Sequence, residues 1–154
     1  MRLKKHDTQF NGFGFPVNLC NWPHIEVDGS LEPDIDYELL QDYLFKILPE
    51  KPSQLSGAEI KFIRHHMGMT QFAFAKWIET VDTSTIAKWE AKDLHPTGMG
   101  PDTEKSIRIK MYIEMQKKIR RKTIKIDDMV ELLKKRTSKR GPLSVDFSEL
   151  QLGA

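Results

Sequence analysis

Cysteine is almost absent from this chain. Its single copy, Cys20, excludes an internal disulfide and any site that needs several thiolates. We find no apolar run of about 18 residues, the length that a membrane-spanning helix requires. The first residues, MRLKKHDTQFNGFG, lack the apolar stretch of a secretory signal. These absences predict a protein of the reducing cytoplasm.

The motifs that usually carry chemistry are also missing. The sequence has no P-loop, no GxGxxG and no nucleophile elbow, and no nucleophile is paired with a base. Cys20 and His24 lie four residues apart, but two ligands do not make a zinc site. We therefore expect no enzyme, no metal and no cofactor.

Charge is small in total and uneven along the chain. The net charge is +2, with 5 Lys and Arg against 9 Asp and Glu in residues 1–55, 5 against 5 in residues 56–100, and 14 against 8 in residues 101–154. The basic last third fits an acidic partner such as a nucleic acid, and it fits equally well a helix with a charged outer face.

Aromatic and β-forming residues open the N-terminal part, FGFPVNLCNW, and a turn signal follows at Asp28 and Gly29. We expect a short edge strand or hairpin there. Asp36 can cap an amphipathic helix over DYELLQDYLFKIL. The prolines of PEKPSQ then break the pattern. Residues 1–50 are thus expected to form an accessory unit of short strands plus one helix, and 51–55 a linker.

Closely spaced helix signals begin at Ser56. Ser56 and Glu59 form a capping box, Gly68 stops the first helix, and Thr70 and Asp82 can cap the next two. A longer helix is expected within residues 102–120 and a basic helix within 121–140. The last residues, 141–154, are expected to form a flexible tail.

The stretch from Gly68 to Glu90, GMTQFAFAKWIETVDTSTIAKWE, resembles the helix-turn-helix of the Cro and phage-repressor (XRE) superfamily. The resemblance covers about residues 55–116 and holds many positions at fixed spacing. It implies a mainly α fold, a five-helix lambda-repressor-like DNA-binding domain over residues 56–120 beside the small α+β accessory unit. An accessory region before one such domain also resembles the MqsA-like antitoxins, without the cysteines that hold their zinc.

In this motif the second helix enters the major groove with its first turns toward base edges. Short polar side chains outside the core suit that position. The resemblance also implies phosphate contacts around the preceding helix and a scaffold ion pair. The base-reading candidates are Thr83, Ser84 and Lys88, the phosphate candidates are Thr70, Gln71, Thr85 and Lys92, and the scaffold pair is Arg64 with Glu90.

The turn between the two helices departs from the family pattern, because it is one residue longer and has no glycine. We expect the first helix to end at Ile78 or Glu79. The extra residue is expected to widen the loop and so relieve the need for a positive φ. Phe72 and Trp77 fall at positions that usually face solvent, and we favour cover by the accessory unit or the tail.

The leading hypothesis is a cytoplasmic, nucleoid-associated transcriptional regulator that binds double-stranded DNA as a homodimer. It would act as a repressor, and an autoregulating antitoxin that binds a toxin through its N-terminal unit is one form of this. The alternative is a protein-interaction adaptor that kept the fold without specific DNA binding. The basic runs KKIRRKTIK and KKRTSKR could add phosphate contacts. A second apolar edge at Ile109, Tyr112 and Ile113 is either a dimer seam or buried.

Overall fold

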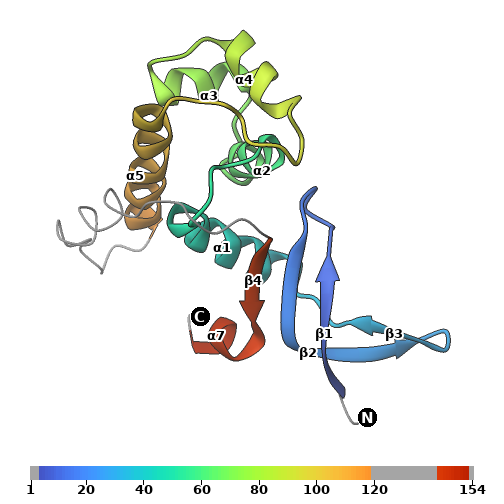
Figure 1. The fold of residues 1–154 in the computed structure, drawn as a ribbon. Helices are drawn as coiled ribbons and strands as arrows, with labels where there is room; N and C mark the ends of the chain where they lie inside the picture. The colour runs from blue at the N-terminus through green and yellow to red at the C-terminus, as the bar shows by residue number, and fades with distance from the viewer. Residues whose placement is uncertain (1–3, 119–141, 153–154) are drawn as a thin grey trace. The chain divides into compact units, whose positions relative to one another are not determined.

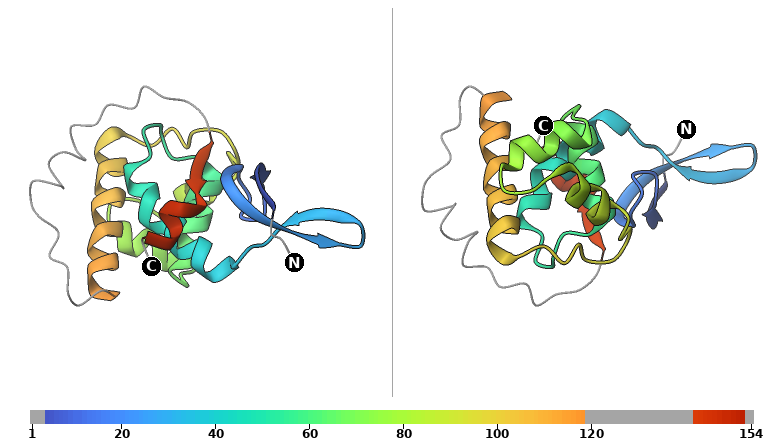
Figure 2. Two further views of the ribbon diagram at one scale, coloured as in Figure 1. Left: turned by 90° about the horizontal axis from the view of Figure 1, so that it is seen from below. Right: turned by 90° about the horizontal axis from the view of Figure 1, so that it is seen from above.

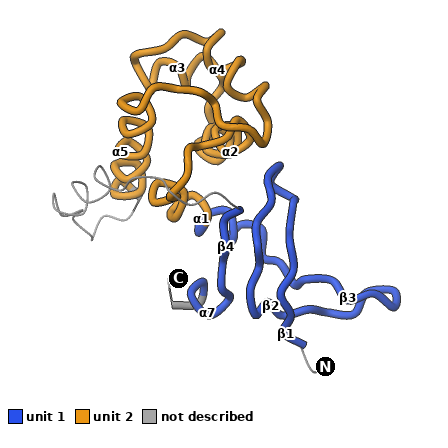
Figure 3. Tube along the Cα trace, in the orientation of Figure 1, with its two compact units in different colours: residues 1–43, 141–154 blue, residues 44–140 orange. Residues whose placement is uncertain are grey.

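The computed structural model describes residues 4–118 and 142–152. The chain folds into two compact units, residues 1–43 with 141–154 and residues 44–140 (Figure 3). The boundary passes within the helix α1 (Tyr37–Ile47). Each unit has its own buried apolar residues.

The first unit contains a four-stranded mixed sheet (Figure 1). β2 is the central strand and pairs antiparallel with β1 and β3, and parallel with β4. Residues 24–27, the last of β2, pair with β3 and form a two-stranded ribbon that extends from the rest of the sheet (Figure 2). The strands are β1 (Lys4–Phe10), β2 (Val17–Val27), β3 (Ser30–Pro33) and β4 (Leu143–Asp146).

The C-terminal segment supplies β4 and the helix α7 (Phe147–Leu152). β4 aligns Val145 with Leu19 of β2, and both side chains are fully buried. The Phe147 ring meets the edge of the buried Trp22 ring with centroids 5.3 Å apart, and the Trp22 indole donates to the carbonyl of Asp34. Residues 143–152, expected to be a flexible tail, therefore complete the N-terminal core.

The predicted fold class was wrong. A mainly α chain with a small α+β accessory unit does not describe a structure whose N-terminal unit is built on a four-stranded mixed sheet, beside six α-helices in the described ranges. β1 was missed because its residues, KKHDTQF, are largely polar and largely exposed, so no apolar alternation marks it. β4 was missed because it pairs with a strand more than 120 residues away, a contact without any local signal.

The second unit is helical. The helices are α1 (Tyr37–Ile47), whose last residues belong here, the 3₁₀ turn η1 (Leu48–Glu50), α2 (Gly57–His66), α3 (Gln71–Ile78), α4 (Thr83–Glu90) and α5 (Pro101–Lys118). Local chemistry sets their starts. Ser56 and Glu59 form the predicted capping box, and the Thr70 and Asp82 side chains accept from the backbone of the third residue after each. Gly68, at φ +66°, follows the end of α2 and stops that helix.

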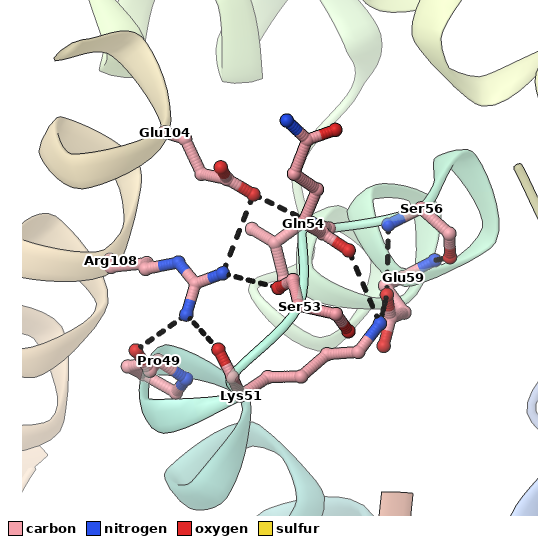
Figure 4. A network of polar contacts seen from close by, with 9 residues as sticks. Pro49, Lys51, Ser53, Gln54, Ser56, Glu59, Glu104 and Arg108 are labelled. Carbon is pink, nitrogen blue, oxygen red and sulfur yellow. Dashed lines mark hydrogen bonds and ion pairs between the residues drawn. The ribbon is translucent and has the colours of Figure 1, made fainter. Parts of the chain in front are cut away.

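Residues 51–55, the expected linker, are held closely by α5 (Figure 4). The buried Arg108 guanidinium donates to the carbonyls of Pro49, Lys51 and Ser53, and Glu104 accepts from the Leu55 amide at 2.6 Å. A planar cation with five donors can satisfy several buried carbonyls at once. This segment is thus an ordered part of the helical unit.

None of the helices within the described ranges is both long enough and apolar enough to cross a membrane.

Candidate nucleic-acid interface

The α3–α4 pair is the part of the helical unit that the sequence assigned to DNA. α3 presents Phe74, Ala75 and Ile78 to the core, and α4 presents Ile86 and Trp89. These five positions recur at helix spacing, so one face of each helix is fixed in the core.

The outer face of α4 is formed by short side chains and by one basic residue, Lys88. Ser84 and Lys88, one turn apart, are both exposed, and Ala87 and Ala91 lie exposed beside them. Short side chains let a helix backbone approach a surface closely, and an alanine methyl can contact the thymine methyl group. The sequence reading named neither alanine, although helix spacing from Ile86 and Trp89 would have placed both outward. Thr83, the third base-reading candidate, is half-buried.

Asp82 organises the N-terminal end of α4. Its Oδ1 accepts from the Thr85 amide at 2.9 Å and from the hydroxyls of Ser84 and Thr85, each at 2.8 Å. The Thr85 hydroxyl and amide and the Ser84 hydroxyl lower the pKa of Asp82 to about 2. Ser84 and Thr85 therefore donate their protons within the protein and offer a ligand only lone pairs, beside a permanent negative charge.

Glu90 anchors the C-terminal end of α4. It accepts from the Arg64 guanidinium at 2.5 and 3.2 Å and from the Gln71 amide at 2.7 Å, while Arg64 also donates to the carbonyl of Met69. The predicted Arg64–Glu90 pair is thus present, and both side chains are about nine-tenths covered. Gln71, expected on phosphate, joins this pair instead. We call these three residues the α4 clasp.

The charge state of the clasp follows from its contacts. Burial alone would raise the pKa of Glu90, but hydrogen bonds from Arg64 and Gln71 and the positive charges of Arg64 and Lys61 outweigh it and hold that pKa below its usual value. Glu90 is therefore ionised at neutral pH, as a paired carboxylate beside a guanidinium should be.

A second anchor is the approach of α2 to the end of α4. The Gly57 and Ala58 amides, at the start of α2, donate to the carbonyls of His95 and Asp93. A Cβ on Gly57 would lie 2.1 Å from the carbonyl oxygen of Trp89, so only glycine fits. Orphan amides of one helix thereby meet carbonyls just beyond the end of another.

The turn between α3 and α4 differs from expectation. α3 ends at Ile78, but Glu79 takes φ +75° and ψ −30°, so the longer turn does not avoid a positive φ. Such a conformation is costly for a residue with a side chain and persists only where its surroundings enforce it. Val81, within the turn, is half-buried, and Asp82 caps α4 as predicted.

The two unexpected aromatic residues have different environments. Trp77 is half-buried, stacks on Phe74 with centroids 5.4 Å apart and lies under Lys110 of α5, so its cover comes from the helical unit itself. Phe72 is 59% exposed, and the Lys76 ammonium lies 4.6 Å from its ring centroid.

The remaining candidates are less constrained. Thr70 is exposed and its hydroxyl caps α3, while Lys92 is exposed just after α4. On the second edge of α5, Ile113 is exposed and the Tyr112 hydroxyl donates to Glu50. Most of KKIRRKTIK and all of KKRTSKR lie outside the described residues, as does the expected basic helix. Within the described ranges no three His, Cys, Asp or Glu side chains gather as metal ligands.

Comparisons of the chain with protein-family models, with curated proteins and with solved structures found no match.

Proposed function

We propose that α3 and α4 form a helix-turn-helix that binds double-stranded DNA with α4 in the major groove, and that the chain is a sequence-specific transcriptional regulator acting as a homodimer. The observation that carries this proposal is the contrast across α4. Its inner side is fixed by Ile86, Trp89 and the α4 clasp, and its outer side is a shallow surface of Ser84, Ala87, Lys88 and Ala91. A rigid helix with a small-residue face suits the floor of the groove.

Base discrimination would come from few groups. Lys88 can donate to a guanine edge or to a phosphate, and Ala87 can contact a thymine methyl. Thr70 and Lys92 are the exposed phosphate candidates. Asp82 adds a fixed carboxylate, which accepts from a cytosine amino group and repels phosphate. Repressor activity and membership in the XRE superfamily stay predictions from the sequence.

The test is selection of bound duplexes from a randomised pool by the full chain. A homodimer should enrich a two-fold symmetric motif whose half-sites lie about one helical turn, 10–10.5 base pairs, apart. Failure to enrich any motif at low salt contradicts the proposal. Enrichment of a single half-site without a symmetric partner would support α4 as the reading helix and contradict binding as a homodimer.

A second candidate is a protein-interaction module that does not bind DNA specifically, including an antitoxin that neutralises a toxin through its N-terminal unit. Asp82 favours it, because a permanent carboxylate at the tip of α4 opposes approach to phosphate. The equal charge count of residues 56–100 and the exposed Phe72 point the same way. The same selection separates the two candidates, since the module would enrich no motif.

A further inference from the structure

Glu79 needs an external support. It is exposed and takes φ +75°, and within α3 and the turn its backbone amide donates to the carbonyl of Ala75. Its carboxylate makes a long ion pair with Lys110 of α5. Where the related pattern would use glycine, this chain places a residue that resists the conformation. The α3–α4 turn must therefore be enforced from outside, by groups packed against the end of α3.

Lys110 of α5 is placed to do this. Its ammonium donates to the carbonyl of Trp77 at 2.6 Å, lies 5.8 Å from the Trp77 ring centroid, and is 3.8 Å from the Glu79 carboxylate. The Trp77 carbonyl belongs to the last turn of α3, where carbonyls lack helical partners, and a cation there also complements the helix dipole. The Lys110 side chain is only 25% exposed, which strengthens this contact, whereas the Glu79 side chain is 78% exposed and its ion pair is weak.

We propose that Lys110 is a positioning residue for α4: by binding the end of α3 it holds Glu79 at positive φ and so sets the direction in which α4 begins. The effect on DNA rests on the proposed function, but the coupling between Lys110 and Glu79 does not. α5 touches no base in this scheme and acts through the turn.

The experiment is a double-mutant cycle in the full chain with Lys110→Met and Glu79→Gly. Met keeps most of the aliphatic length and removes the ammonium. Gly adopts positive φ without support. Each variant is measured for its urea unfolding midpoint, for its affinity toward the selected duplex and toward a scrambled duplex, and for the backbone amide NMR shifts of residues 79–83.

Lys110→Met should weaken binding to the selected duplex on the order of tenfold and leave the scrambled duplex almost unchanged, because misdirecting α4 removes base contacts and keeps phosphate attraction. Glu79→Gly alone should change little. Adding Glu79→Gly to Lys110→Met should restore most of the affinity for the selected duplex. It should also return the amide shifts of residues 79–83 to their wild-type values. Lys110→Arg should retain binding, and Lys105→Met, an exposed lysine on the same helix, controls for loss of charge.

Two results overturn the proposal. Equal weakening on both duplexes, matched by Lys105→Met, makes Lys110 an ordinary source of positive charge. Additive effects of the two substitutions on the unfolding midpoint, with unmoved amide shifts in Lys110→Met, show that Lys110 does not hold the turn. If the unaltered chain prefers no duplex, the proposed function fails, and the unfolding cycle with the amide shifts alone decides whether Lys110 and Glu79 are coupled.

Discussion

The two ends of α4 are built in opposite ways. The C-terminal end is locked by the α4 clasp and by Gly57, whose contacts come from α2 and from the start of α3. The N-terminal end is capped by its own neighbour Asp82, and an outer face of exposed residues runs from Ser84 along the helix to Ala91. Substitutions at the locked end should therefore change folding, and substitutions on the exposed outer face should change binding alone.

The largest effect is expected from Gly57→Ala. Its Cβ would overlap the Trp89 carbonyl, so the end of α4 must move, and the free energy of unfolding should fall by about 3 kcal/mol or more. Urea titration followed by tryptophan fluorescence measures this. Gly100→Ala is the control, because a Cβ on Gly100 would meet open space. Gly100 comes just before α5, and replacing a glycine by alanine at a helix N-terminus should lower the free energy of unfolding by no more than about 1 kcal/mol. Similar losses of unfolding free energy in the two variants would contradict the claim that Gly57 fixes the end of α4.

Ala87→Glu should have the next largest effect, on the exposed outer face of α4. The carboxylate would lie on the outer face, repel phosphates and block close approach, so DNA affinity should fall on the order of a hundredfold. The unfolding midpoint should stay constant because the side chain remains in solvent. Fluorescence anisotropy with the selected duplex gives the affinity. Unchanged affinity shows that this face does not contact DNA.

Glu90→Gln breaks the clasp without changing its shape. It leaves the Arg64 cation without a carboxylate but keeps one acceptor oxygen, and we expect the free energy of unfolding to fall by about 1–3 kcal/mol. Glu114→Gln, which breaks an exposed ion pair with Lys117, should cost about 0.5 kcal/mol at most. Equal losses contradict a structural role for the clasp.

The same variant has a pH signature. Because folding lowers the pKa of Glu90, its contribution to stability should be complete above its ordinary pKa of 4.5 and should disappear as pH falls through the lower folded value. The stability gap between the wild type and Glu90→Gln should therefore narrow in acid. A gap that stays constant down to strongly acid pH shows that the ionised carboxylate is not what stabilises this end.

Lys88→Ala should give the smallest effect. We expect a several-fold loss of DNA affinity and a reduction of the salt slope by about 1 if Lys88 contacts a phosphate. If Lys88 reads a guanine, the loss should concentrate on one base position and the slope should hold. Folding should be unaffected in both cases. A variant that binds as well as the wild type at every salt concentration removes Lys88 from the interface.

Local signals predicted much of the helical unit. Caps at Ser56, Thr70 and Asp82 depend on residues within one turn, and the Arg64–Glu90 pair followed from the resemblance. Contacts between distant segments gave no comparable signal in the local sequence. β4 pairs with β2 across most of the chain, and Lys110 binds the carbonyl of Trp77, 33 residues before it. The positive φ of Glu79 was missed because its support lies in that distant contact.

The most direct test of the central claim is the affinity of the unaltered full chain for the selected duplex and for a scrambled duplex of equal length, compared across a salt series. The selected duplex should bind about a thousandfold or more tightly than the scrambled one near physiological salt, and both affinities should weaken as salt rises. Equal affinity for the two duplexes at every salt concentration would contradict the assignment of α4 as a DNA-reading helix.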